Sequence, residues 1–271
     1  MLFAAMQANA KLLDLEANIA AIDAATRRAA DAGASILVTP ELFVTGYSPR
    51  RVRAALRPAD LSDLSDRIDA IAARHGIGLV YSLPVVSDDG SWLIGARLVD
   101  RDGVPRLRYA KVHLFGDEEK ANFAPADAPP EIADIDGMKV SLAICYDIEH
   151  PEVARAATRS GADVILVPTA VLAGYTDVPR LLVRSRALEN HIGIVYANHS
   201  GIEADNEFCG TSIVVGPDGV ALGEASQGES ELVFGEIDRP GIEAQRRDVP
   251  YLENSRPDTY RNWQDRVSLR R

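Results

Sequence analysis

The fold is decided by the segment Val140-Ser-Leu-Ala-Ile-Cys145-Tyr-Asp-Ile-Glu-His-Pro-Glu-Val-Ala-Arg155. Its first part is an apolar run with β-branched members, which predicts a buried strand. The run ends at Cys145, and Pro151 and Glu152 suit the first turn of a helix. A cysteine between a strand and a helix would project above the sheet, where open α/β sheets bind ligands. The N–H of Tyr146 could face a developing oxyanion there, although most lone cysteines are buried structural thiols.

The composition of the chain is that of a globular protein. Its 271 residues are 46% hydrophobic, so a hydrophobic core of ordinary size can form, and neither disulfides nor a structural metal ion are needed for stability. A net charge of -11 argues against nucleic acid as a partner. The two cysteines, Cys145 and Cys209, have no metal-site spacing and fit a reducing compartment. With no export signal and no bilayer-spanning segment, we expect a cytoplasmic protein without a membrane partner.

Helical and strand patterns alternate along the chain in two blocks, with hairpin signals between and after them. The strand segments are nearly continuous apolar runs, which favours sheets that are covered on both faces. We therefore expect one domain, residues 1–271, of the α/β class with an α-β-β-α layering. Residues 48–57 are expected to form a polar linker and residues 111–134 a long loop. The polar, proline-containing segment 239–271 is expected to contact a partner subunit rather than join the core.

Two further residues have the chemistry that a cysteine nucleophile requires. A thiol is a modest nucleophile until it loses its proton, so a base and a cation are needed nearby. Glu41 follows Pro40 at the end of a short apolar strand, where a carboxylate has no packing role. Lys111 closes another strand. Taken singly, each is explained as simply by a solvated charge at the end of a strand.

Taken together, three motifs in fixed order resemble the nitrilase, or carbon–nitrogen hydrolase, superfamily. They are Pro40-Glu41-Leu42 with Thr45-Gly46-Tyr47, Tyr109-x-Lys111-x-His113-Leu114, and Cys145-Tyr146-Asp147 with Pro151-Glu152. The resemblance covers nearly the whole chain. It implies a triad of Glu41, Lys111 and Cys145 on a four-layer α-β-β-α sandwich that usually dimerises. It also implies a homodimer or higher homo-oligomer, and chemistry that uses neither a metal ion nor an organic cofactor.

The same resemblance implies a second glutamate in the loop after the lysine. The local pattern Glu119-Lys120-x-x-Phe123 indicates Glu119, and the preceding Glu118 is the alternative. Its expected role is to orient Lys111 and the nitrogen of the substrate amide.

The expected chemistry is nucleophilic catalysis. Glu41 would take the thiol proton as Cys145 attacks a carbonyl, and would later activate the water that hydrolyses the thioester. Lys111 would favour the thiolate and, with the N–H of Tyr146, hold the oxyanion.

Several other residues are candidates for the surroundings of the site. Thr169, Ala170 and Tyr175 follow the strand next to Cys145, so they either touch the substrate or form a simple turn. His199 stands where the family often has arginine, and it is either a structural histidine or part of the pocket mouth.

These patterns predict an amidase that hydrolyses a small carboxamide to a carboxylic acid and ammonia. Tyr146 and the run 111–119 resemble amide hydrolases, whereas nitrilases usually have tryptophan after the nucleophile. An N-carbamoyl-amine hydrolase needs the same triad and is the alternative. A catalytically idle interaction protein of the same fold would have no use for these three residues. The tail of the substrate stays open, because Arg50, Arg184 or Arg186 could each bind a second carboxylate.

Overall fold

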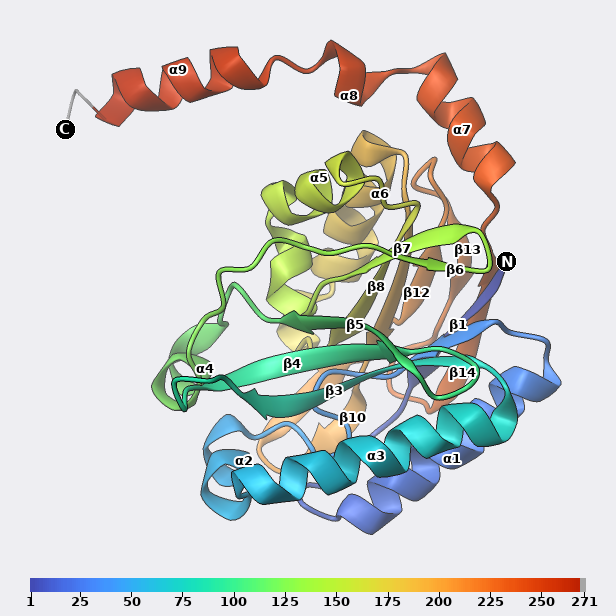
Figure 1. Cartoon of the computed structure of the whole chain (residues 1–271), viewed down its shortest axis with the longest axis vertical. Coiled ribbons are helices and arrows are strands. Elements are labelled where there is room, and N and C mark those ends of the chain that lie inside the picture. Colours follow the sequence, from blue (N-terminus) through green and yellow to red (C-terminus); the bar gives the residue numbers. More distant parts are fainter. Residues whose placement is uncertain (269–271) are drawn as a thin grey trace.

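Two six-stranded sheets lie face to face in the computed structural model, which describes residues 1–268 (Figure 1). Helices α1 (Leu15–Asp31) and α3 (Pro58–His75) cover the outer face of the first sheet. Helices α5 (Pro151–Arg159) and α6 (Arg184–Asn190) cover the outer face of the second. The α/β class and the four-layer α-β-β-α arrangement predicted from the sequence are therefore confirmed.

Each sheet contains three parallel strands flanked by antiparallel ones. The first sheet has the order β14 (Glu231–Glu236), β1 (Leu2–Gln7), β2 (Ile36–Val38), β3 (Gly78–Val86), β4 (Trp92–Val99), β5 (Pro105–Ala110). The second has the order β13 (Ala221–Glu224), β12 (Ile213–Val215), β9 (Gly193–Asn198), β8 (Val164–Thr169), β7 (Met138–Leu142), β6 (Ala133–Ile135). Strands β1 to β3 and β7 to β9 are the parallel sets, and parallel strands end at a common edge where ligands bind. A hairpin of β10 (Ser200–Glu203) and β11 (Asn206–Cys209) follows β9.

The strands are buried on both faces because each sheet lies between two layers. In β1, Phe3 and Ala5 belong to the core between the sheets. The alternate residues Ala4 and Met6 belong to the core under α1 and α3. This double burial explains why the strands are nearly continuous apolar runs in the sequence. No helix within residues 1–268 has the length and apolar character needed to cross a bilayer.

Two sequence expectations about connecting segments are wrong. Residues 48–57 contain the helix α2 (Pro49–Ala55), and Pro49 occupies its first turn, where a missing N–H costs nothing. The supposed loop 111–134 contains the helix α4 (Gly116–Asn122) and the start of β6. Helices of seven residues show too little of the 3.6-residue period to be recognised from the sequence.

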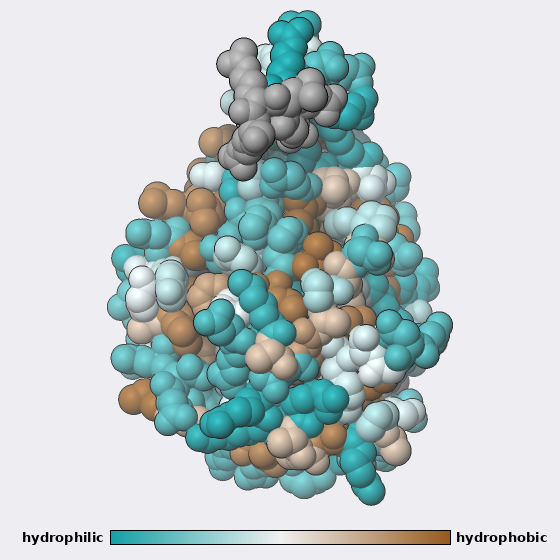
Figure 2. Space-filling model, turned by 90° about the vertical axis from the view of Figure 1, so that its left-hand side faces the viewer, coloured by the Kyte–Doolittle hydropathy of each residue, from teal (hydrophilic) through white to brown (hydrophobic). Residues whose placement is uncertain are grey.

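The C-terminal extension consists of α7 (Arg239–Asp248), α8 (Tyr251–Asn254) and α9 (Pro257–Ser268). It does join the core at its beginning, contrary to expectation, because Ile242 is fully buried and belongs to the main hydrophobic core. Arg246 also binds Asp163 at 3.2 Å. Beyond α7 the extension still touches the second helical layer, because Tyr251 of α8 stacks on His191 with ring centroids 5.1 Å apart and Arg159 of α5 donates to Ser255 at 2.8 Å. Its last helix, α9, projects from the body, and Figure 2 shows hydrophilic residues above the rest of the molecule. Residues 269–271 lie outside the described part of the chain.

Candidate active site

The two sheets bring the four predicted catalytic side chains to one edge of the sandwich. Glu41 follows β2, Lys111 follows β5, Cys145 follows β7, and Glu119 lies on α4. All four are buried, with exposed fractions of 0 to 5%. The N–H of Glu41 donates to the carbonyl of Thr169 at 3.1 Å, which ties the end of β2 to the end of β8 in the other sheet. Residues far apart in the sequence are thus held within one buried cluster.

Lys111 bridges the two glutamates of this cluster. Its Nζ donates to Oε1 of Glu41 at 2.7 Å and to Oε1 of Glu119 at 2.8 Å. Burial raises the pKa of Glu41 to about 7, although the Lys111 ammonium opposes the shift. Burial also disfavours the charge of Lys111, but the two carboxylates and Cys145 outweigh it and raise the Lys111 pKa. Lys111 is therefore an ammonium, and Glu41 can gain or lose a proton near neutral pH.

Cys145 begins a 3₁₀ turn, Cys145–Glu149, directly after the strand β7. Its φ is +47°, a left-handed conformation that is rare for a residue with a Cβ and typical of functional turns. The buried carboxylate of Asp147 holds this turn in place. It accepts the backbone N–H of His113 at 2.9 Å and the hydroxyl of Tyr109 at 3.0 Å. The turn is thereby fixed to the segments on either side of Lys111.

Burial has the largest effect on the pKa of the Cys145 thiol. Burial and the Glu41 carboxylate raise the pKa of the Cys145 thiol well above its ordinary value, and the lowering effect of Lys111 is smaller. Lys111 does act in the expected direction, since its charge lowers the pKa of the Cys145 thiol, but burial and Glu41 raise this pKa by more. Oε2 of Glu41 is buried without a hydrogen-bond partner among the described residues, which leaves it free to accept a proton.

The structure distinguishes the two neighbouring acids of α4. Glu119 is buried and, besides Lys111, accepts the hydroxyl of Tyr47 at 2.5 Å and the N–H of Phe115 at 2.7 Å. Glu118 is exposed and accepts the N–H of Arg50 at 3.1 Å. The hydrogen bond between Tyr47 and Glu119 was not predicted from the sequence. The only indication of a role for Tyr47 was its place in a family motif.

His199 lies beneath the cluster and not at the mouth of a pocket. It is fully buried, and its Nε2 donates to the backbone carbonyl of Glu41 at 2.6 Å. Burial lowers the pKa of His199 to about 4, so the ring is neutral at physiological pH. Its other nitrogen, Nδ1, lies 3.6 Å from Oε2 of Glu203, whose pKa burial raises to about 7.

A cavity of about 230 Å³ opens beside Cys145. It is lined by Phe115, Cys145, Tyr146, Glu149, Ala170, Val171, Leu172 and Tyr175. Three of the predicted contacts, Tyr146, Ala170 and Tyr175, are therefore in its wall. Thr169 is not in the wall, and its hydroxyl donates to that of Tyr196 at 3.1 Å. The lining of this cavity by Glu149 was not anticipated from the sequence.

None of the three arginines considered as carboxylate clamps lines this cavity. Arg186 donates to the backbone carbonyls of Ile148 and Glu149 at 3.2 and 2.9 Å. Arg184 pairs with Glu224 at 2.8 Å, and Arg50 is exposed beside α4. Arg186 thus supports the turn after Cys145, which is a structural use of its charge.

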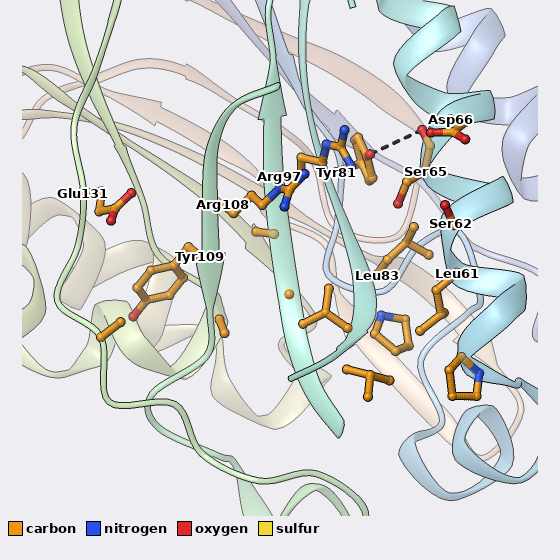
Figure 3. Close-up of a pocket in the computed structure, with 18 of the residues that line it drawn as sticks. Leu61, Ser62, Ser65, Asp66, Tyr81, Leu83, Arg97, Arg108, Tyr109 and Glu131 are labelled. Atoms are coloured by element: carbon orange, nitrogen blue, oxygen red, sulfur yellow. Dashed lines mark hydrogen bonds between the residues drawn. The ribbon is translucent and has the colours of Figure 1, made fainter. Parts of the chain in front are cut away.

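A larger cavity of about 720 Å³ lies between α3, the strands β3 to β5 and residues 128–131 (Figure 3). Tyr81 and Arg97 face it from the strands and Leu61 faces it from α3. It includes no member of the buried Lys111 cluster, so the smaller cavity is the candidate active site. Within residues 1–268, no group of three or more His, Cys, Asp or Glu side chains is arranged to hold a metal ion.

Comparison with known proteins gives consistent matches along the chain. The profile of the carbon–nitrogen hydrolase family matches residues 2–247. The solved structure of an amidase from Nesterenkonia sp. AN1 matches with a TM-score of 0.89 and 40% identity, covering 97% of this chain and 99% of that one. In a glutamate-to-glutamine variant of that amidase, acrylamide has added to the active-site cysteine.

Two curated relatives are similar over most of their length. A hydrolase encoded in the pqqF 5′ region of Pseudomonas protegens is 36% identical, over 92% of this chain and 86% of its own. The 2-oxoglutaramate amidase of Bacillus subtilis is 30% identical, over 84% of this chain and 87% of its own.

Proposed function

Because the chain belongs to the carbon–nitrogen hydrolase family, we propose that it is an amidase with Cys145 as nucleophile, Glu41 as base and Lys111 as oxyanion donor. The observation that carries this proposal is the buried ammonium of Lys111, held by two carboxylates beside a thiol that lines a cavity. The similarity to an amidase that is modified at its active-site cysteine supports the same assignment.

Acylation begins with a protonated thiol. As Sγ of Cys145 attacks the amide carbon, its proton passes to Glu41, whose pKa of about 7 suits a general base at neutral pH. Nζ of Lys111 and the N–H of Tyr146, in the first turn after the strand, stabilise the oxyanion. Each such donor contributes about 10²- to 10³-fold in rate. Glu41 then gives its proton to the departing nitrogen, so ammonia leaves and a thioester remains.

Deacylation uses the same groups in reverse. Glu41 takes a proton from water as the oxygen attacks the thioester carbon, and the C–S bond breaks to release the carboxylic acid. The sulfur recovers the proton from Glu41, which returns the site to its resting state. Glu119 keeps Lys111 directed at the oxyanion, and the hydrogen bond from Tyr47 fixes Glu119 in turn.

The proposal is tested by ammonia release from short aliphatic amides, amino-acid amides, 2-oxo-dicarboxylic monoamides, N-carbamoyl amines and nitriles. We expect turnover of carboxamides by the wild-type chain and none by Cys145→Ala, with both proteins showing the same circular dichroism spectrum. Turnover of N-carbamoyl amines alone would show that the chain is an N-carbamoyl-amine hydrolase and not an amidase. Turnover by Cys145→Ala near the wild-type rate would refute the assignment of Cys145 as the nucleophile.

We further propose that the protein is a homodimer or larger homo-oligomer to which the C-terminal extension contributes. Its α8 and α9 expose Tyr251, Tyr260 and Trp263, which are 45, 41 and 57% accessible. Exposed aromatic side chains on a projecting segment are typical of a protein interface.

A further inference from the structure

We propose that the cavity beside Cys145 binds the acyl part of an amide through an ammonium group, with Glu149 as its carboxylate partner. The same cavity should exclude amides whose acyl part carries a carboxylate in the position of that ammonium. This inference rests on the proposed amidase function and specifies the class of substrate. It follows from the position of Glu149, the charges around it, and the aromatic residues that line the same cavity.

The turn that starts at Cys145 also places Glu149. Glu149 ends the 3₁₀ segment Cys145–Glu149, so the nucleophile and the acid belong to one rigid turn. The guanidinium of Arg186 fixes this end of the turn by donating to the carbonyls of Ile148 and Glu149. Both Cys145 and Glu149 line the same small cavity. A group bound at Glu149 is therefore close to a carbonyl carbon held at the sulfur.

Among residues 1–268 the Glu149 carboxylate forms no direct ion pair, although the charges of Lys111 and Arg186 act on it and lower its pKa. Arg186 donates a hydrogen bond to the backbone carbonyl of Glu149 and not to its carboxylate. Its Nη1 pairs with the carboxylate of Glu189 at 2.9 Å. Lys111 is already shared between Glu41 and Glu119. Burial raises the pKa of Glu149, and the opposing charges of Lys111 and Arg186 offset this rise only in part. A bound ammonium would supply the remaining compensation.

The other walls of the cavity suit a cation as well. Phe115 packs edge to face against Tyr146, with ring centroids 5.4 Å apart, and against Tyr175, with centroids 5.8 Å apart. Aromatic faces attract ammonium groups, and the attraction grows when water is excluded. No lysine or arginine is among the eight lining residues. Three aromatic rings and one acid thus favour an ammonium and repel a carboxylate.

The experiment compares three amides of similar size at pH 7. They are 3-aminopropanamide, which carries an ammonium, butanamide, which is neutral, and succinamic acid, which carries a carboxylate. We expect kcat/KM to fall in that order. In Glu149→Gln the ratio of kcat/KM for the ammonium amide to that for the carboxylate amide should fall by about 10- to 100-fold, the effect of unit charges roughly 6 Å apart. The matched control is Glu152→Gln, an exposed acid on α5, which should leave the ratio as it is.

Alkylation of Cys145 separates failure of this inference from failure of the amidase proposal. The inactivation rates with 2-bromoethylamine, iodoacetamide and iodoacetate report the charge of the cavity without any turnover. Glu149→Gln should raise the rate with iodoacetate relative to that with 2-bromoethylamine. If no amide is hydrolysed but the alkylation rates shift in this way, the amidase proposal fails and the charge assignment stands. A wild-type preference for succinamic acid, or ratios unchanged in Glu149→Gln, would overturn the inference.

Discussion

Replacing Lys111 with methionine tests whether the buried ammonium is what allows two carboxylates to share one site. Nζ lies 2.7 and 2.8 Å from the oxygens of Glu41 and Glu119, and all three side chains are at most 1% exposed. Methionine fills a similar volume without charge, so it leaves two buried carboxyl groups with no cation between them. Removing one partner from a buried ion pair costs about 3–5 kcal/mol of unfolding free energy. For a chain of this size the corresponding fall in Tm is about 6–20 °C.

The loss should depend on pH, with a definite sign. The folded pKa of Glu41, about 7, lies above its ordinary value of 4.5. The contribution of such a group to stability is fully present below the unfolded pKa and is lost as pH rises through the folded pKa. Without Lys111 the folded pKa rises further, because the opposing ammonium is gone. The variant should therefore be closest to the wild type at pH 5 and furthest from it at pH 8.

Urea unfolding followed by circular dichroism at these two pH values measures the effect. Lys120→Met removes an exposed ammonium of the same helix as Glu119 and should cost less than about 1 kcal/mol. The triple variant Glu41→Gln, Lys111→Met, Glu119→Gln removes all three charges and should recover most of the stability at pH 8. The reasoning is refuted if Lys111→Met alone stays within about 1 kcal/mol of the wild type at pH 8, or if the triple variant is no more stable than the single one.

Three more outcomes follow from the same contacts. The acidic limb of the kcat/KM profile should titrate near pH 7, rising with pH, because Glu41 must be ionised to accept the thiol proton; a flat profile from pH 5 to 8 would argue against this base. Glu119→Gln should lower kcat by at least about 10²-fold and Glu118→Gln should not, as stopped assays of ammonia release would show; the reverse would move the second acid by one residue. Deletion of residues 256–271 should shift the mass from light scattering towards that of a monomer, whereas an unchanged mass would remove the extension from the interface.

Burial on both faces made the fold predictable from the sequence. A strand such as 164–167 is apolar at every position, and only a sheet covered on both sides requires that. The order of the three motifs then indicated which strand ends meet. The helices α2 and α4 were beyond this reasoning, because seven residues give fewer than two turns and their positions depend on what they pack against.

The electrostatic state of the site could not be predicted from the same residues. The sequence shows that a lysine accompanies Cys145, and a cation near a thiol by itself favours the thiolate. Only the structure shows that Lys111 is fully buried and paired with two carboxylates. The negative charge of Glu41 raises the Cys145 pKa by more than Lys111 lowers it. Burial then dominates at the sulfur, and the pKa of Cys145 rises. The same residue types would give the opposite charge state at a surface.

The spacing of the two carboxylates is set outside the cavity, by the hairpin β10–β11. His199, just before β10, holds the backbone of Glu41. Oε1 of Glu203, at the end of β10, accepts the N–H of Tyr47 at 2.7 Å, and the hydroxyl of Tyr47 positions Glu119. Gly46 makes this approach possible, because its φ is +77° and a Cβ there would lie 2.5 Å from Oε1 of Glu203. A change in this hairpin therefore acts on both acids together, although neither His199 nor Glu203 lines the cavity.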